Sequence, residues 1–203
     1  MEIFELYKGF AEIFEENGFS LYIGGGSARD ILLGRTPTDL DLVTNATPEE
    51  EKTFLNDWYY SFSKFGIISK KIEGIEVDIA TMRKEEGYED FRHPSKVTFI
   101  TSLEEDSKRR DFTINALYID KNKKVYDFHN GREDLKKKLI RFIGDPATRI
   151  KEDPLRIIRA ERFAKKLGFE IEENTKNAIN KYRYLLDRLN TPKVEMELKK
   201  NYE

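Results

Sequence analysis

Cysteine is absent from the 203 residues of this chain, and no apolar stretch approaches the roughly 20 residues that a helix needs to span a bilayer. The N-terminus also lacks the apolar segment and cleavage site of a secretory signal. A chain without disulfide-forming residues, signal or spanning segment is typical of the cell interior. We therefore expect a soluble, cytoplasmic protein that has no membrane partner.

An excess of charge of one sign is also missing, because 36 Lys and Arg face 38 Asp and Glu and the formal net charge is −2. This total does not indicate a nucleic-acid binder, since phosphates are recognised by local groups of Lys and Arg. Such groups occur at 108–110, 136–138 and 156–166, although a solvated face is the simplest interpretation of each. A hydrophobic content of 38% is enough for a globular core.

The order of the expected elements indicates an α+β fold. Apolar residues at helical spacing predict a helix over 3–14, and a short strand at 20–23 follows. Further expected elements are a helix at 27–33, a strand at 40–43, a helix around 48–58, strands at 67–72, 76–81, 97–100 and 117–119, a loop at 83–95, and helices at 153–167, 172–188 and from 192. We expect a mixed sheet with flanking helices, and helices alone from about residue 145.

Asp39 and Asp41, which one residue separates, are carried by the strand expected around Leu40, Leu42 and Val43. Because successive side chains on a strand alternate faces, both carboxylates are expected to point the same way and to reach a common cation. Oxygen ligands of this kind suit Mg²⁺, which bridges carboxylates to substrate phosphates. Phosphoryl or nucleotidyl transfer is the chemistry that this pattern favours, and a pair of solvent-facing aspartates in a loop is the alternative.

Gly25 and Gly26 precede the expected helix at 27–33 and allow backbone to approach a ligand closely. The N–H groups that open this helix at Ser27 are suited to holding an anion, so a phosphate is expected beside the aspartates. The stretch is not a P-loop, because no G-K-[ST] follows, and the dinucleotide pattern G-x-G-x-x-G is absent. A tight structural turn remains the alternative for the glycines.

Together these residues resemble the first motif of the class II tRNA nucleotidyltransferases, the CCA-adding enzymes, and of the related bacterial poly(A) polymerases. The pattern GG-x-x-R-D, L-G and D-x-D is carried here by Gly25, Gly26, Arg29, Asp30, Leu33, Gly34, Asp39 and Asp41. The resemblance implies that Asp39 and Asp41 hold two Mg²⁺ ions, with Gly26 and Arg29 on the incoming triphosphate. Gly24 departs from the pattern, since relatives commonly place an apolar residue there.

Two further motifs resemble the same family. "IEVDIATMR" offers Asp78 as a third catalytic carboxylate facing Asp39 and Asp41, and an exposed strand aspartate is the alternative. "RRDFTINALYID" implies that Arg110 contacts the nucleotide and that Asp111 lies near the sugar, where a carboxylate can accept a hydrogen bond from a ribose 2′-OH. Asp111 is also suited to capping a helix over 113–117.

"EDPLRIIRAERFAKKLGF" places Asp153 and Arg156 three residues apart at a helix start, on one face. By resemblance this pair reads the incoming base. One carboxylate acceptor and one guanidinium donor match both cytosine and adenine, whereas uracil and guanine present the reverse pattern. Asp153 followed by proline is equally an expected helix cap, although capping does not require Arg156. The family assigns Arg159 and Arg162 to nucleotide contact as well, and an exposed basic stripe is the competing interpretation.

The resemblance implies a catalytic head at 1–138 and a helical neck for base recognition at 139–203, with the body and tail domains of relatives apparently missing. The expected function is addition of CCA, or of its terminal A, to the tRNA 3′ end from CTP and ATP. A poly(A) polymerase and a nucleotide- or RNA-binding fragment without turnover are the alternatives. The stretch 84–99 resembles the flexible loop of relatives that add the terminal adenosine, and neither His93 nor His129 shows ligand spacing.

Overall fold

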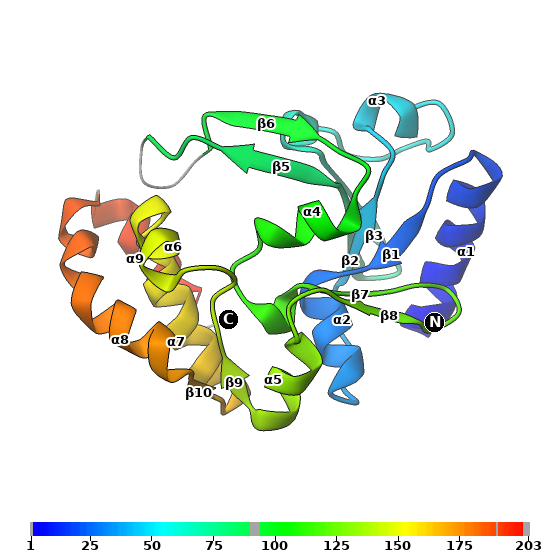
Figure 1. The fold of residues 1–203 in the computed structure, drawn as a ribbon. Coiled ribbons are helices and arrows are strands. Elements are labelled where there is room, and N and C mark those ends of the chain that lie inside the picture. The colour runs from blue at the N-terminus through cyan, green and yellow to red at the C-terminus, as the bar shows by residue number, and fades with distance from the viewer. Residues whose placement is uncertain (1, 90–93, 190, 201–203) are drawn as a thin grey trace. The chain divides into compact units, whose positions relative to one another are not determined.

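The computed structural model describes residues 2–89, 94–189 and 191–200 (Figure 1). The chain divides into two compact units. The first comprises Met1–Lys84, Val97–Arg109 and Asn115–Phe128, and the second comprises Glu85–Lys96, Arg110–Ile114 and His129–Glu203. This division falls ten residues before the expected one at 138, and two segments from the earlier part of the chain join the second unit. Each unit is described separately below.

A six-stranded mixed sheet forms the centre of the first unit, in the order β3-β4-β2-β1-β7-β8. Its strands are β1 (Leu21–Ile23), β2 (Leu40–Thr44), β3 (Ile67–Ile72), β4 (Ile75–Thr81), β7 (Leu117–Ile119) and β8 (Val125–Asp127). Only β2 and β4 run parallel; the other neighbouring strands are antiparallel. All five of these strands other than β8 were predicted from the sequence, and β8 was not.

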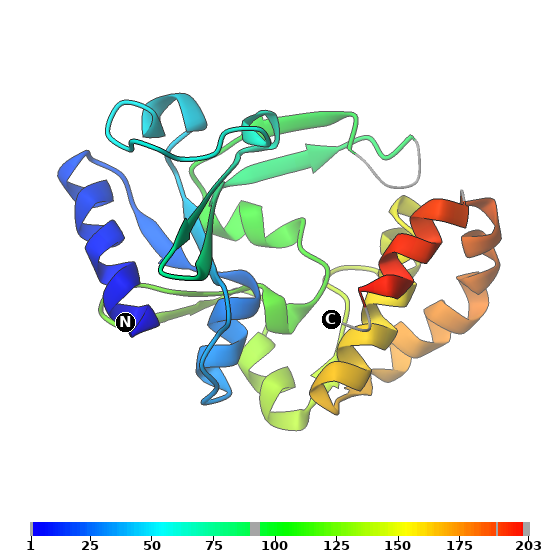
Figure 2. The same cartoon turned by 180° about the vertical axis from the view of Figure 1, so that it is seen from behind.

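The helices of this unit are α1 (Ile3–Glu16), α2 (Gly25–Leu32), α3 (Pro48–Glu51) and α4 (Leu103–Lys108), with a 3-10 turn η1 (Ser63–Phe65). α1 packs along β1, and α2 packs along β2 and β7 (Figures 1 and 2). The expected helix at 48–58 is wrong beyond its first turn. A capping box between Thr47 and Glu50 starts α3, but α3 ends at Glu51, and the chain then reaches Tyr59, which bridges Ser69 beside β3.

Alternation along the central strands sets which side chains enter the core. In β2, Leu40 and Leu42 are buried, and in β4, Val77 and Ile79 are buried. The residues between them are only partly buried and point to the opposite face of the sheet, as period-two alternation requires. The pattern places the aspartate of each strand on that opposite face.

The second unit is built mainly from helices: α5 (Gly131–Lys137), α6 (Pro146–Glu152), α7 (Leu155–Leu167), α8 (Glu173–Tyr182), the 3-10 turn η3 (Arg183–Arg188) and α9 (Thr191–Lys199). The expectation of helices alone missed a parallel pair of short strands, β9 (Leu139–Ile140) and β10 (Glu170–Ile171). α7 begins at Leu155 rather than at Asp153, because Asp153 ends α6 in an extended conformation and Pro154 follows it.

The expected loop at 83–95 begins with a strand. β5 (Arg83–Glu86) and β6 (Lys96–Phe99) form a separate two-stranded sheet. Residues 90–93, which include His93 and part of the stretch that resembles the flexible loop, lie outside the described residues. The 3-10 turn η2 (Thr113–Asn115) completes the elements.

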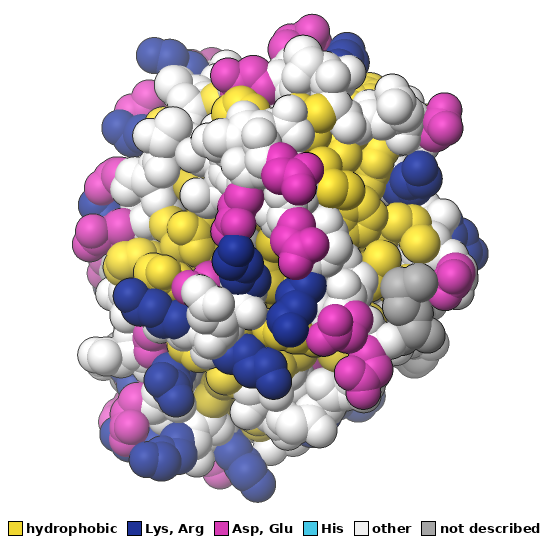
Figure 3. Space-filling model, turned by 90° about the vertical axis from the view of Figure 1, so that its right-hand side faces the viewer, with side chains coloured by type: hydrophobic (Ala, Val, Ile, Leu, Met, Phe, Trp, Pro, Cys, Tyr) yellow, Lys and Arg dark blue, Asp and Glu magenta, His cyan; other side chains and the backbone are white. Residues whose placement is uncertain are grey.

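On the face seen in Figure 3, basic and acidic side chains are interspersed with apolar ones, as the balanced composition predicts. No helix in the part of the chain that the structure describes is long and apolar enough to cross a membrane. The α+β class, with a mixed sheet flanked by helices and followed by a mainly helical region, is confirmed.

Candidate nucleotidyltransferase site

Asp41 and Asp78 lie side by side in the first unit. β2 and β4 pair in parallel with Asp41 opposite Asp78, so the two side chains emerge from adjacent strands on the same face of the sheet. Ser69 of β3 is the register partner of Asp78 on its other side, and its hydroxyl donates a hydrogen bond to Asp78 Oδ1. A row of Asp41, Asp78 and Ser69 therefore crosses three neighbouring strands.

The carboxylate of Asp41 also meets the start of α2. Its Oδ2 accepts hydrogen bonds from the backbone N–H groups of Gly26 at 3.1 Å and of Ser27 at 3.4 Å. These are among the N–H groups of a helix start that have no partner within the helix. Gly25 and Gly26 belong to the first turn of α2 rather than to a turn before it, and Gly25 has φ +52°.

Asp39 comes directly before β2 instead of lying on it, and it is exposed. Its backbone is nevertheless fixed by Ser27. The Ser27 hydroxyl donates to the Asp39 carbonyl at 2.9 Å and accepts from the Asp41 N–H at 2.8 Å. Ser27 thus links the D-x-D segment to α2. It occupies a variable position between the motif residues, so the pattern alone did not identify it.

Arg29 is buried on α2 and is held by two side chains. Its Nε donates to Asp30 Oδ1 at 2.9 Å, and its Nη1 donates to Asn115 Oδ1 at 2.8 Å. Asn115 comes from the motif around Asp111 but was not among the expected site residues. Asn115 lies 86 residues from Arg29 in the sequence, so no local pattern could predict this contact. The place of Asn115 in the motif was the one sequence feature that pointed to it.

The donor set near Asp41 fits a hard divalent cation in its chemistry, because Asp41 and Asp78 present carboxylate oxygens side by side with Asp39 two residues upstream. Within residues 2–89, 94–189 and 191–200, however, no group of three or more His, Cys, Asp or Glu side chains is placed to hold an ion.

Asp111 is the centre of an ion network in the second unit. Its Oδ1 accepts from Arg156 Nε at 2.8 Å, and its Oδ2 accepts from Arg159 Nε at 2.6 Å. Burial alone would raise the pKa of the Asp111 carboxyl, but the guanidinium groups of Arg159 and Arg156 outweigh burial and hold this pKa well below its usual range. Asp111 therefore stays ionised, and its carboxylate binds arginines instead of capping a helix.

Asp153 and Arg156 are both almost fully buried but do not pair with each other. Asp153 Oδ2 accepts from Arg159 Nη2 at 2.7 Å, and its Oδ1 accepts from the Leu155 N–H at 3.0 Å, which is a capping contact. Pro154 rather than Asp153 is the N-cap residue of α7, so the expected cap is shifted by one position, although the Asp153 side chain still binds the first N–H of the helix. Arg159 joins Asp111 to Asp153 and so links the two predicted carboxylates.

The remaining predicted residues lie around this network. The carbonyl of Arg110 accepts from Arg149 Nη2 at 2.9 Å. Arg162 is not part of the network, because its Nη1 donates to Glu197 Oε1 of α9 at 2.6 Å. Tyr88, which sequence reasoning did not single out, places its ring 5.5 Å from the Arg156 guanidinium carbon, and its hydroxyl donates to Glu85. Burial and this hydrogen bond raise the pKa of Tyr88 to about 12, so the hydroxyl stays protonated.

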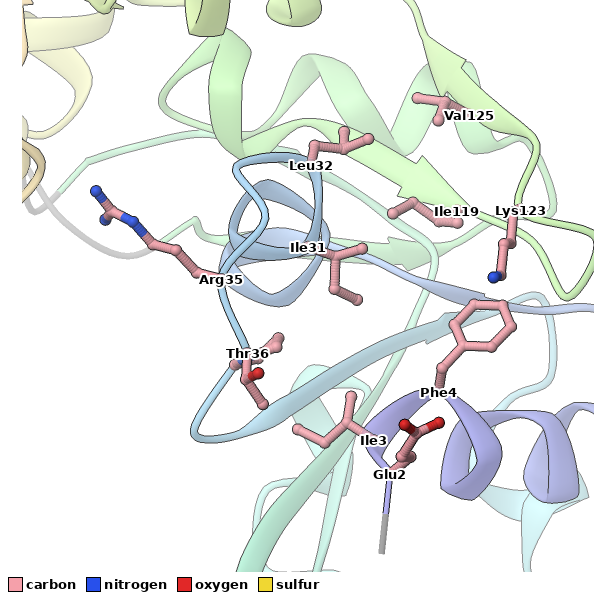
Figure 4. A pocket seen from close by; sticks show the side chains of 11 residues that line it. Glu2, Ile3, Phe4, Ile31, Leu32, Arg35, Thr36, Ile119, Lys123 and Val125 are labelled. Atoms are coloured by element: carbon pink, nitrogen blue, oxygen red, sulfur yellow. The ribbon is translucent and has the colours of Figure 1, made fainter.

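A cavity of about 550 Å³ lies elsewhere in the first unit, and none of the predicted site residues lines it. It is bounded by the start of α1, the end of α2 and the β7–β8 hairpin. Figure 4 shows Phe4, Ile31 and Ile119 around it, with the Lys123 amine over the Phe4 ring, 5.1 Å from its centroid. The cavity is therefore separate from the carboxylates.

Comparison with known proteins agrees with this geometry. The family described as the poly A polymerase head domain matches residues 21–141, and the chain belongs to this family. This confirms the resemblance stated above.

Particular relatives are similar over nearly the whole chain. It is 43% identical to the CCA-adding enzyme of Lactobacillus helveticus (strain DPC 4571), covering 92% of this chain and 47% of that protein, and 40% identical to that of Bacillus pumilus (strain SAFR-032), covering 91% and 46%. The crystal structure of the Bacillus stearothermophilus CCA-adding enzyme in complex with CTP aligns with a TM-score of 0.88 at 33% identity, over 99% of this chain and 49% of that one. The chain thus spans about half the length of these relatives.

A tRNA nucleotidyltransferase complexed with a primer tRNA and an incoming ATP analog aligns with a TM-score of 0.76 at 33% identity, over 93% of this chain and 54% of that one. The fold is therefore shared with a protein described as a tRNA nucleotidyltransferase.

Proposed function

We propose that this chain forms the catalytic and base-reading part of a Mg²⁺-dependent, cytoplasmic tRNA nucleotidyltransferase that adds CCA, or its terminal A, from CTP and ATP. The observation that carries the proposal is the pairing of Asp41 with Asp78 directly at the start of α2, in a chain whose relatives are CCA-adding enzymes. In this proposal the first unit is the head, and the helical part of the second unit is the neck.

The reaction joins the tRNA 3′ oxygen to the α-phosphorus of the nucleotide. The bond between the α-phosphorus and the bridging oxygen breaks, pyrophosphate leaves, and the hydroxyl proton passes to solvent. Asp39 and Asp41, assisted by Asp78, would hold Mg²⁺, and the bound ion would supply activation of the hydroxyl and neutralisation of charge on the triphosphate. We assign the phosphate oxygens to the N–H groups of the first turn of α2 and to Arg29, because the start of a helix attracts anions.

Base selection is assigned to Arg156 and Asp153. Arg156 Nε donates a hydrogen bond to Asp111. Its Nη1 donates two hydrogen bonds, one to the Arg149 carbonyl and one to Glu152. Among the described residues, its Nη2 has no hydrogen-bond partner, so this edge is left to donate to a base. Asp153 supplies the acceptor. Cytosine and adenine match one donor beside one acceptor, and uracil and guanine do not. Asp111, beside Arg156, is assigned to the ribose 2′-OH.

The test is extension of tRNAs that lack the last three, two or one nucleotides, with each of the four nucleoside triphosphates supplied alone and then together. A CCA-adding enzyme incorporates CMP twice, then AMP once, and stops. An A-adding enzyme extends only the tRNA that lacks its final nucleotide. Binding of CTP and ATP without any product would identify a nucleotide-binding fragment and contradict the proposal.

A poly(A) polymerase is the second candidate, because the matching family is described by that activity and shares the motifs. The two enzymes differ in product rather than in these residues. Extension of an unstructured RNA by many adenylates would favour the polymerase, whereas a stop after CCA on tRNA would exclude it.

A further inference from the structure

Arg149 occupies a position in the second unit from which it touches two parts of the ion network. It lies on α6 and is only 9% exposed. Its Nη1 donates to Glu152 Oε2 at 2.9 Å, and its Nη2 donates to the carbonyl of Arg110 at 2.9 Å. The side chain therefore connects α6 to the backbone that leads into Asp111.

The same Glu152 oxygen also receives Arg156. Arg156 Nη1 donates to Glu152 Oε2 at 2.8 Å and to the backbone carbonyl of Arg149 at 2.7 Å. One hydrogen of Arg156 Nη1 is therefore bound by the backbone of Arg149, and the other by Glu152, which itself binds the Arg149 side chain. The Asp111 carboxylate accepts a hydrogen bond from Arg156 Nε. These three contacts fix the orientation of the guanidinium group and leave Nη2 as its nitrogen without a hydrogen bond to any described residue.

Glu152 depends on Arg149 for its place. Its side chain is 28% exposed, so hydration competes for its carboxylate. With Arg149 present, two guanidinium groups share one carboxylate oxygen and hold it over Arg156 Nη1. A lysine at 149 has a single ammonium group and lacks the planar fork that reaches Glu152 and the Arg110 carbonyl at once.

We propose that Arg149 is a positioning residue for base selection, which holds Glu152 against Arg156 Nη1 so that only the Nη2 edge of Arg156 is offered to the incoming base. The inference rests on the proposed function. Without Arg149, Arg156 is free to rotate and to meet a base with other donors, and the distinction between cytosine and uracil weakens.

The test compares wild type with Arg149→Gln and Arg149→Lys by calorimetric titration of CTP and UTP in the presence of Mg²⁺. The readout is the ratio of the two dissociation constants, which partial unfolding does not change because both nucleotides meet the same folded population. Arg149→Gln is expected to lower the preference for CTP by about tenfold or more, and Arg149→Lys by less. Arg141→Gln is the matched control, since Arg141 pairs with Asp134 and Glu172 in the same unit.

An unchanged ratio in both Arg149 variants, with a wild type that prefers CTP, would overturn this inference alone. A wild type that binds CTP and UTP equally would overturn the base-reading assignment and the inference with it. Failure of tRNA extension in a protein that still prefers CTP would count against the transferase activity and leave the role of Arg149 supported by the binding ratio.

Discussion

Gly25 and Asp41 are in contact at the start of α2. A Cβ atom built on Gly25 would lie 3.0 Å from Asp41 Oδ2, and the φ of +52° at Gly25 belongs to the left-handed region that side chains rarely adopt. The glycine is therefore required both by the backbone conformation and by the approach of the carboxylate. It allows Asp41 Oδ2 to receive the N–H groups of Gly26 and Ser27.

Gly25→Ala is expected to destabilise the protein by about 2 kcal/mol, because the left-handed conformation is strained for alanine and the new Cβ presses on the carboxylate. Gly26→Ala is the matched control. A Cβ at Gly26 would lie 3.4 Å from Arg29 Nη2 and 3.6 Å from Asp41 Oδ2, and Gly26 has no positive φ, so a change within about 0.5 kcal/mol is expected. Denaturant unfolding measures both; equal losses would contradict the contact.

Glu51 is a buried carboxylic acid in the first unit. Both of its carboxyl oxygens, and the hydroxyl of Tyr60, are buried and have no hydrogen-bond partner among the described residues. Burial, and secondarily the charge of Glu50, raise the pKa of Glu51 to about 9. Burial and the proximity of Glu51 also raise the pKa of Tyr60. The acid is therefore neutral in the folded protein near pH 7.

The raised pKa of Glu51 predicts that stability falls as pH rises. The unfolded chain loses this proton near its ordinary value of 4.5, whereas the folded protein keeps it up to about 9, so unfolding is favoured progressively across this window and the loss is complete above it. The slope from this group is at most about 1.4 kcal/mol per pH unit. Glu51→Gln should remove this slope in denaturant unfolding between about pH 5 and pH 8.

Glu49→Gln serves as the control for Glu51, because Glu49 is exposed and pairs with Lys52 at 3.2 Å. The change of unfolding free energy with pH in Glu49→Gln should equal that of the wild type. A slope that persists in Glu51→Gln would show that the carboxyl is ionised in the fold.

Asp111→Asn is expected to cost about 3 kcal/mol at neutral pH, because two neighbouring guanidinium groups would lose their shared carboxylate. The depressed pKa of Asp111 means that its stabilisation is present above the ordinary aspartate value near 3.8 and is lost as pH falls below it. Wild type should therefore lose stability in acid more steeply than the variant. Asp187→Asn, at an exposed position, should change the unfolding free energy by less than about 0.5 kcal/mol.

Local patterns predicted much of this fold. The alternation in β4 and the helical spacing of α1 reflect burial that is visible within a few residues. Asp39 was misplaced by one position, since apolar spacing does not locate the first ladder hydrogen bond. α3 was predicted too long, because nothing local in 52–58 announces the positive φ of Asp57.

In the candidate site, the sequence predicted the residues that belong to motifs and not the contacts between them. The motifs supplied Asp41, Asp78, Asp111 and Arg156, but not their partners. Asp111 meets Arg156 and Arg159 across 45 and 48 residues, and such pairings depend on how helices pack. Asp153 and Arg156 were expected on one helix face, but nothing in the sequence indicated that the Asp153 carboxylate would bind Arg159.

The most direct test of the account is incorporation of CMP into tRNA lacking its final three nucleotides, compared between wild type, Asp41→Asn and the control Asp187→Asn at saturating Mg²⁺. Asp41→Asn keeps the size of the side chain but removes its charge, so the rate is expected to fall about a hundredfold or more while Asp187→Asn stays at the wild-type rate. An Asp41→Asn protein that extends tRNA as fast as wild type would contradict a catalytic role for the carboxylate at the start of α2.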